Sequence, residues 1–262
     1  MVDQELKIQY YNSVYNTEAN RLPGFLRTHR DHLRGHQEII SRYADVRHSL
    51  ELVQGQGNPE VVALAEILGR DQREQLIGGL KDMGYQYAHY GQGAALRGLP
   101  GNHDEIVIAT KDLALQAMEL PALDLPSHQH GHGGGLVGVK LPDIQAEVFA
   151  GHLPLPSRRE SYARHVEVLE QALHRQNQAR RALLMGDFNL TPQELADQHP
   201  DLLKGMDRAS PDVPTCTTVW PINWFYDKCL DHIHVRGFTP VRGEAMLWRS
   251  DHRAITAVIR VG

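Results

Sequence analysis

The stretch that decides the fold is LLMGDFNLTP, residues 183–192. An apolar run that ends at a glycine predicts a buried strand ending near Gly186. Residues i and i+2 of a strand point the same way, so Asp187 and Asn189 would share a face at its end. A carboxylate that accepts a proton and a carboxamide that donates to an anion suit one site. Gly, Asp and Asn also favour turns, so the stretch alone leaves a plain turn open.

The length and composition of the chain limit the classes of protein to which it can belong. A chain of 262 residues with 41% hydrophobic and 23% charged residues is ordinary for a globular protein with one large domain or two small ones. No apolar stretch approaches the ~20 residues of a membrane span, and the N-terminus lacks a secretory signal. Cys216 and Cys229 have no metal-binding spacing. We expect free thiols, a reducing compartment and a cytoplasmic location.

The net charge of the chain limits the kinds of binding partner that we expect. The formal net charge is −5, which argues against a nuclease that depends on nonspecific contact with long duplex DNA. A local basic patch stays open. The 16 histidines make the true charge depend on pH between about 5 and 8.

The rest of the chain mixes strand-like and helix-like segments. We expect helices at about 23–52, 71–83 and 158–177. We expect strands at 7–11, 60 to about 66, 85–90, 105–110, 113–118, 136–141, 144–150, 182–185, 229–235 and 253–261. Without clean alternation of strand and helix, the pattern favours α/β layers with mixed sheets.

Polar residues recur where these strands end. They are Asn12, Glu66, His152, Asp187 with Asn189, Asp231, and Asp251 with His252. Each alone has an ordinary explanation as a cap, a surface charge, a core histidine or a loop residue. Layered α/β proteins bind ligands at strand ends, so the set taken together predicts a functional site.

This set, in this order, resembles the endonuclease/exonuclease/phosphatase superfamily. The matching stretches are KIQYYN (7–12), PEVVALAE (59–66), FAGHLP (149–154), LLMGDFNLTP (183–192), CLDHIHV (229–235) and SDHRAI (250–255). The resemblance implies a four-layered αββα sandwich of two mixed β-sheets flanked by helices. It also implies one catalytic domain over residues 1–262 and hydrolysis of a phosphoester with a divalent metal.

The resemblance assigns the metal and the attacking water to one group of residues. Glu66 would be the principal carboxylate for Mg²⁺ or Mn²⁺, with Asn12 beside it and Asp251 as a further acid. Hard cations of this kind take oxygen ligands and keep several waters. Asp187 would orient and deprotonate the attacking water, and Asn189 would donate a hydrogen bond to the water or the phosphate.

The resemblance assigns the phosphate to the histidines. His252 would contact a phosphate oxygen that gains charge in the transition state, and Asp231 would fix its tautomer. His152 would be a second donor to the phosphate. A phosphodiester is anionic and repels hydroxide, so its cleavage needs this charge neutralisation and a positioned water.

Two other motifs are interpreted as loops. GNHD (101–104) matches part of the pattern of calcineurin-like metallophosphoesterases, but in that pattern it follows the GD motif, whereas here it precedes it. His128, His130 and His132 lie in a Gly-rich segment and could bind zinc or nickel adventitiously. A solvated loop is favoured there, because a dedicated metal site needs rigid support around its ligands.

Several residues bear on the substrate. Trp224 belongs to an aromatic stretch, 220–226, on which bases could stack or which could simply pack over the core. Arg158 could hold a second phosphate or simply open a helix. Single-stranded nucleic acid and a small phosphodiester are therefore the expected substrates, and we expect no obligate protein partner.

Three functions remain at this point. The first is a metal-dependent phosphodiesterase or nuclease, and the second is a phosphatase acting on a small metabolite or lipid headgroup. The third is a non-catalytic binding protein on the same fold. The third is disfavoured because a degenerate site should have lost at least one of the residues named above.

Overall fold

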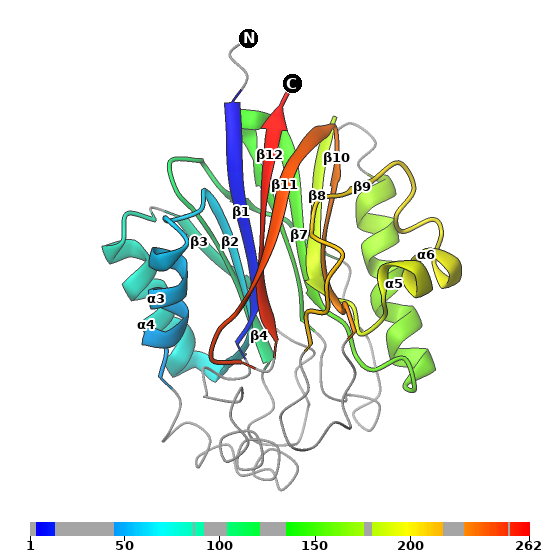
Figure 1. The fold of residues 1–262 in the computed structure, drawn as a ribbon, viewed down its shortest axis with the longest axis horizontal. Coiled ribbons are helices and arrows are strands. Elements are labelled where there is room, and N and C mark those ends of the chain that lie inside the picture. The colour runs from blue at the N-terminus through cyan, green and yellow to red at the C-terminus, as the bar shows by residue number, and fades with distance from the viewer. Residues whose placement is uncertain are drawn as a thin grey trace, which may run out of the picture.

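The computed structural model describes residues 4–13, 45–85, 87–91, 104–120, 135–175, 180–216, 228–250 and 252–262. These residues form two six-stranded sheets packed face to face, with helices on both outer faces (Figure 1). The first sheet has the strand order β11-β12-β1-β2-β4-β3 and the second has the order β5-β6-β7-β8-β10-β9. Both sheets contain one parallel pair among antiparallel neighbours, so both are mixed. The predicted four-layered αββα sandwich is confirmed.

The elements have the following bounds. The first sheet contains β1 (Gln4–Asn12), β2 (Val61–Leu68), β3 (Tyr87–Gly91), β4 (Asp104–Thr110), β11 (Phe238–Leu247) and β12 (Arg253–Val261). The second sheet contains β5 (Gln116–Ala117), β6 (Gly135–Leu141), β7 (Ala146–His152), β8 (Arg181–Asp187), β9 (Asp207–Arg208) and β10 (Asp231–Arg236). The helices are α3 (Arg47–Gly55), α4 (Gly69–Asp82), α5 (Arg159–Arg175) and α6 (Pro192–Gln198), and Pro142–Ile144 form a 3₁₀ turn.

Alternation along the strands builds the central core. In β1, Leu6, Ile8 and Tyr10 face the second sheet, while Tyr11 packs on the other side, beneath α3 and α4. Strands β7, β8 and β10 contribute apolar residues to the same central core in the same alternating way. Two sheets packed face to face bury their inner side chains in one layer, and this layer holds the sandwich together.

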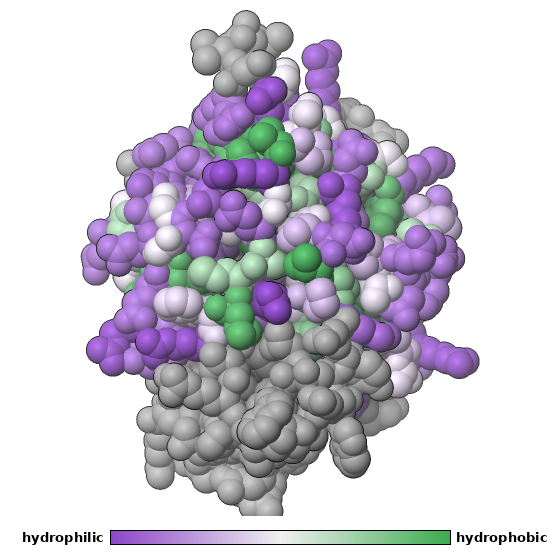
Figure 2. All heavy atoms as spheres, in the orientation of Figure 1, coloured by the Kyte–Doolittle hydropathy of each residue, from purple (hydrophilic) through white to green (hydrophobic). Residues whose placement is uncertain are grey.

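The helices cover the outer faces. Helices α3 and α4 lie against the first sheet and α5 and α6 against the second, each pair over its own apolar cluster (Figure 1). On the face shown in Figure 2, hydrophilic side chains surround a few apolar ones. The exposed large hydrophobic residues of the described chain are Leu155, Val213, Val241 and Leu247. Among the described residues, no helix is long and apolar enough to cross a membrane.

Strand direction brings the polar strand ends together. Strands β1 and β2 are parallel, as are β7 and β8, so each pair ends at one edge. Strands β12 and β10 are antiparallel to β1 and β8, so they begin where those strands end. At the other end of the sandwich, Gln4 pairs with Val261. The predicted polar strand ends that the structure describes therefore fall at one end of the molecule, and they are Asn12, Glu66, His152, Asp187, Asp231 and His252.

Four segments differ from the sequence predictions. The strand expected over 113–118 comprises only Gln116–Ala117, which pair with the end of β6. Helix α6 and strand β11 had no counterpart in the prediction. Helix α3 runs to Gly55, and the rest of the helix expected from residue 23 lies outside the described residues, apart from 45 and 46, which precede α3.

Candidate active site

Polar side chains line one end of the central core, on the same inward face as the apolar residues. In four strands, the side chains that point toward the central core are apolar along most of the strand. At the end of each strand that borders this region, the inward side chain is polar. These polar positions are Asn12 in β1, His152 in β7, Asp187 in β8 and Asp231 in β10, and all four side chains are buried. The site thus lies where the hydrophobic core between the two sheets ends.

Glu66 reaches this region through a β-bulge. Leu64 pairs with Val107 and Ile67 with Glu105, so two residues of β2 stand opposite one residue of β4. Glu66 itself has a φ of 54°, a left-handed conformation that is costly for a residue with a side chain. Such bulges re-aim a side chain next to many active sites. The strand therefore continues past Glu66 to Leu68, and the prediction that it ends at Glu66 was wrong.

The close approach of β7 and β8 explains why residue 186 is a glycine. A Cβ atom built on Gly186 would lie 2.2 Å from the carbonyl oxygen of Gly151 on the neighbouring strand. Gly151 and Gly186 are paired in register, and the next pair along is His152 and Asp187. Only a residue without a side chain allows β7 and β8 this approach. The glycine thereby sets His152 beside Asp187.

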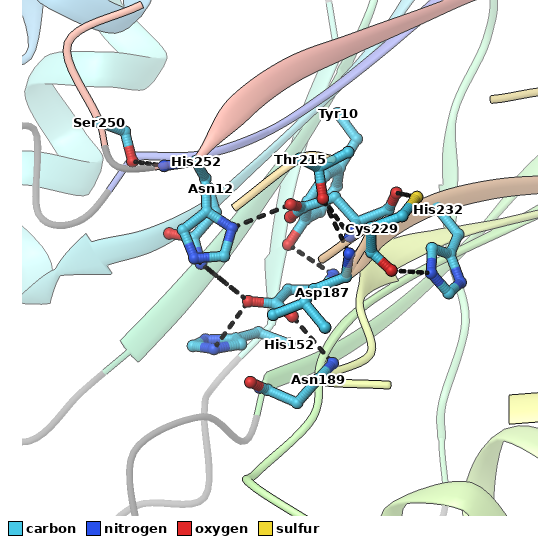
Figure 3. Close-up of polar contacts among 12 residues, drawn as sticks. Tyr10, Asn12, His152, Asp187, Asn189, Thr215, Cys229, His232, Ser250 and His252 are labelled. Atoms are coloured by element: carbon cyan, nitrogen blue, oxygen red, sulfur yellow. Dashed lines mark hydrogen bonds and ion pairs between the residues drawn. The ribbon is translucent and has the colours of Figure 1, made fainter. Parts of the chain in front are cut away.

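The Asp187 carboxylate lies at the centre of the group (Figure 3). Its Oδ2 atom is 3.3 Å from Asn12 Nδ2, 3.7 Å from His152 Nε2 and 3.7 Å from His252 Nε2. Glu66 Oε1 adjoins the same group, 3.0 Å from Asn12 Nδ2 and 3.4 Å from His152 Nε2. Side chains predicted separately at five strand ends, that of Asp187 included, therefore meet in one group.

Asp231 and His252 form a buried pair beside Asp187. His252 Nδ1 lies 2.9 Å from Asp231 Oδ2, so the ring donates this proton and turns Nε2 toward Asp187. Burial alone would lower the pKa of His252, but Asp231, the Cys216 thiol, Asp187 and the hydrogen bond outweigh it and raise that pKa well above its usual value. The raised pKa favours the protonated form of the imidazole.

The pKa of Asp187 is also raised, which for a carboxylate favours the neutral form. Burial and the neighbouring Asp231 carboxylate raise its pKa, and the imidazoles of His252 and His152 offset part of this increase. Ligand atoms of Asp187, Asp231 and His252 all lie within 4.8 Å of one another. A carboxylate whose pKa is raised is a better proton acceptor than an ordinary aspartate, which suits a general base.

Backbone hydrogen bonds fix the segments that carry these groups. Thr215 Oγ1 accepts from the backbone N–H groups of Leu230 and Asp231, each at 2.9 Å. The Ser250 hydroxyl accepts from His252 N at 3.0 Å, and the Tyr11 hydroxyl accepts from Ser250 N at 3.1 Å. Thr215 was missed from sequence because nothing in a threonine-rich stretch distinguishes a buried backbone partner from a surface residue.

Asn189 occupies a strained turn directly after β8. Its φ is 52°, its backbone N–H donates to Asp187 Oδ1 at 2.9 Å, and its Nδ2 donates to Leu153 O at 2.7 Å. The strand ends at Asp187 and a turn follows it, so Asn189 contacts Asp187 through its backbone N–H and not as the i+2 residue of a strand. One amide hydrogen of Asn189 is engaged by Leu153, and the turn keeps the side chain next to Asp187.

Three predicted site residues remain, and they are Arg158, Asp251 and Trp224. Arg158 is exposed in the turn between β7 and α5, and no contact among the described residues links it to the group around Asp187. Asp251 and Trp224 lie outside the described residues, as do His103 and the segment holding His128, His130 and His132. Cys216 and Cys229 are free thiols, as predicted.

Two histidines are buried behind the site, on the outer face of β10. His232 stacks on Phe188 with ring centroids 5.2 Å apart, and its Nε2 donates to Cys229 O at 3.0 Å. Burial lowers the pKa of His232 to about 4. Burial, followed by repulsion from His232, lowers the pKa of His234 to about 3. Both rings are therefore neutral at physiological pH.

Because of these two buried histidines, we expect the folded state to lose stability as the pH falls. In the unfolded chain an imidazole titrates near pH 6.5, whereas in the folded chain His234 stays neutral down to about pH 3. The unfolded chain thus binds more protons in this window, and stability falls as pH decreases below about 6.5. Replacing His234 with leucine should flatten the decline by about 1.4 kcal/mol per pH unit. Urea unfolding at pH 7, 6 and 5 measures this change.

A matched control is His174 on α5, whose Nε2 lies 3.2 Å from Asp201 O near the surface. His174→Leu should leave the pH dependence as in the parent. Because all other titrating groups are common to the proteins, the difference in slope isolates His234. Parallel slopes for the parent and His234→Leu would contradict the prediction.

The fold and the site together define a class, that of four-layered αββα sandwiches with carboxylates and imidazoles gathered at one end of the two sheets. Residues 16–252 match the sequence model of the Endonuclease/Exonuclease/phosphatase family, and the chain belongs to this family. No curated protein sequence gives a significant match to the chain.

Solved structures of low identity share the fold. An endonuclease/exonuclease/phosphatase from Beutenbergia cavernae is 17% identical with a TM-score of 0.70, over 99% of this chain and 72% of its own. TDP2 from D. rerio, complexed with a single-strand DNA product, is 14% identical with a TM-score of 0.66, over 98% and 99%. ANGEL2, a 2′,3′-cyclic phosphatase, is 13% identical with a TM-score of 0.64, over 99% and 96%.

Proposed function

We propose that the protein is a divalent-metal-dependent phosphodiesterase or nuclease that cleaves its substrate with an activated water. The observation that carries this proposal is the Asp187 carboxylate, buried among the Asn12 amide and the imidazoles of His152 and His252. A base with a raised pKa beside fixed hydrogen-bond donors is what the attack of water on an anionic phosphoester requires.

The residues present fit a hard divalent cation. Glu66, Asp187 and Asp231 crowd one end of the core, and their ion pairs to described residues run to the imidazoles of His152 and His252. Asp231 Oδ1 is buried without a hydrogen-bond partner among the described residues. The carboxylate oxygens gathered here favour Mg²⁺ or Mn²⁺, which prefer oxygen ligands.

We assign the cation to Glu66 and Asn12, with Asp251 as a further acid. Glu66 Oε1 and Asn12 lie in contact, at the rim of the buried group. The alternative group of Asp187, Asp231 and His252 is less suitable, because His252 Nδ1 is already engaged by Asp231. When bound, the cation would supply positive charge against the phosphate oxygens and template the substrate.

The protein's own residues carry the proton and the phosphate. Asp187 accepts the proton of the attacking water, and Asn189, held in the adjoining turn, donates to the water or the phosphate. The His252 imidazolium, oriented by Asp231, stabilises the charge that develops on a phosphate oxygen. His152, 3.7 Å from Asp187, provides a second donor.

Arg158 and Trp224 extend the proposal to the substrate, as contacts to a further phosphate and to a base. A structural relative named as a complex with a single-strand DNA product supports nucleic acid, and one named a cyclic phosphatase supports a small phosphoester. The net charge of −5 favours a short or small substrate over long duplex DNA. A single domain over residues 1–262, a cytoplasmic location and the lack of an obligate partner stay predictions.

A panel of substrates tests the function. Single-stranded DNA, RNA, duplex DNA, bis-p-nitrophenyl phosphate and p-nitrophenyl phosphate are incubated with Mg²⁺, Mn²⁺ or EDTA. We expect metal-dependent cleavage of a polymer or a diester, lost in EDTA and reduced at least about 10²-fold in Glu66→Gln. Glu147→Gln is the matched control, since Glu147 is also a buried carboxylate but lies near the start of β7.

The outcomes separate the three functions. Cleavage of p-nitrophenyl phosphate alone would favour the phosphatase over the phosphodiesterase. Turnover that persists in EDTA and in Glu66→Gln would contradict the metal assignment. No turnover of any substrate, with Mg²⁺ still bound in calorimetry, would favour the binding protein.

A further inference from the structure

Two tyrosine hydroxyls hold the backbone on either side of Asp187 and Phe188. The Tyr10 hydroxyl accepts from Asp187 N at 3.0 Å and donates to Gly151 O at 3.5 Å. The Tyr162 hydroxyl donates to Phe188 O at 2.8 Å. Tyr10 is fully buried and Tyr162 is 4% exposed, so water does not compete strongly for either bond.

The two tyrosines approach from opposite faces of the second sheet. Tyr10 extends from β1 across the central core, whereas Tyr162 extends from α5 in the outer layer. In Figure 3, Tyr10 lies on the opposite side of Asp187 from Asn189. The segment that carries Asp187 and Asn189 is therefore fixed by two layers that are not part of its own sheet.

Every backbone polar group of Asp187 and Phe188 has an identified partner. Asp187 O accepts from Leu153 N at 2.8 Å and Phe188 N donates to Leu230 O at 2.9 Å, which are bonds to neighbouring strand ends. The Tyr10 hydroxyl accepts from Asp187 N, which also lies in the β7–β8 ladder opposite His152, and the Tyr162 hydroxyl donates to Phe188 O. Phe188 lies beyond the end of β8, so the Tyr162 hydroxyl supplies a partner for a carbonyl outside the ladder.

We propose that Tyr10 and Tyr162 are positioning residues that set Asp187 and Asn189 against the attacking water and the phosphate. The inference rests on the proposed function, because it concerns how that site is held. Neither tyrosine is a catalytic acid. The Tyr10 O–H points to Gly151 O, and burial, with the nearby Asp231 and Asp187 carboxylates, raises its pKa well above the usual value and keeps it neutral.

Kinetics of the phenylalanine variants test the proposal. Tyr10→Phe keeps the ring and removes the hydroxyl, and we expect kcat to fall about 10- to 100-fold with KM changed less than about threefold, because small misplacements of a reacting group have effects of this size. Tyr162→Phe should lower kcat about 10-fold for the same reason. Unchanged kcat in both variants would overturn the proposal.

Tyr85 provides the matched control for lost stability. Its hydroxyl is also buried and donates to a backbone carbonyl, Pro59 O at 2.6 Å, at a place without site residues. Tyr85→Phe should lower Tm by about as much as Tyr10→Phe and leave kcat within about twofold of the parent. A fall in kcat of equal size in Tyr85→Phe would show a merely structural effect.

Hydrogen exchange separates this inference from the proposed function. The Asp187 amide of the whole protein, without substrate, should exchange at least about 10-fold faster in Tyr10→Phe than in the parent, but not in Tyr85→Phe, because the buried hydroxyl that accepts from it is lost. If the parent cleaves no phosphoester, the proposed function fails while this measurement still reports the positioning bond. An Asp187 amide equally protected in Tyr10→Phe and the parent would overturn the role of Tyr10.

Discussion

Replacement of Asp187 by asparagine is expected to lower kcat by about 10³-fold and to raise Tm in the same protein. Asparagine cannot accept the proton of the attacking water, so turnover is lost. The folded state raises the pKa of Asp187 through burial and Asp231, which means that the ionised carboxylate destabilises the fold at neutral pH. Asparagine resembles the neutral acid and still offers an oxygen to Asn189 N.

The two effects of Asp187→Asn are measured by steady-state kinetics on the cleaved substrate and by thermal unfolding at pH 7.5. For a chain of this size, a gain of ~1 kcal/mol corresponds to a rise in Tm of roughly 2–4 °C. Asp197→Asn is the control, because that carboxylate is exposed on α6 and contacts Gln193. Turnover within tenfold of the parent would remove Asp187 as the base, and a lower Tm would contradict the electrostatic argument.

Replacement of Asp231 by asparagine is expected to lower kcat by about 10²- to 10⁴-fold. The carboxylate accepts from His252 Nδ1 and stabilises the imidazolium, so its loss allows the wrong tautomer and a neutral ring. The variant would still bind substrate, and KM should change far less than kcat. Circular dichroism distinguishes this result from loss of the fold.

A double-mutant cycle with His252→Gln sharpens the prediction. If Asp231 acts through His252, the double variant should be no slower than the slower single variant, because both changes remove one unit. Multiplicative losses would show that the two residues act independently. Asp212→Asn, whose carboxylate pairs with Arg208 at the surface, should leave kcat unchanged.

The sequence was sufficient to predict the layers and the polar strand ends. Apolar alternation located the strands of the central core, and Asp187 and Asp231 lie at ends of regular strands that pair in register. Helix α6 was missed although Thr191 and Glu194 form a capping box with Pro192 at the first position. Strand β11 contains Pro240 and Gly243, residues that argue against a strand away from an edge.

Other features could not be read from the sequence because they depend on pairing. The run VVALAEIL is apolar almost throughout, so the pattern cannot show that Ala65 and Glu66 share one partner residue. Tyr10 looks like an ordinary core residue until the second sheet places Asp187 N at its hydroxyl. Both features arise only when strands distant in the chain are set in register.

The boundary of the central core has a consequence for how the protein gains activity during folding. Asn12 and Glu66 belong to the first sheet, and His152 and Asp187 belong to the second. Neither sheet alone holds a complete set of reacting groups, so a folding intermediate with both sheets formed but not docked would be inactive. Return of activity after dilution from denaturant should therefore follow the closing of the sandwich and lag behind the recovery of secondary structure.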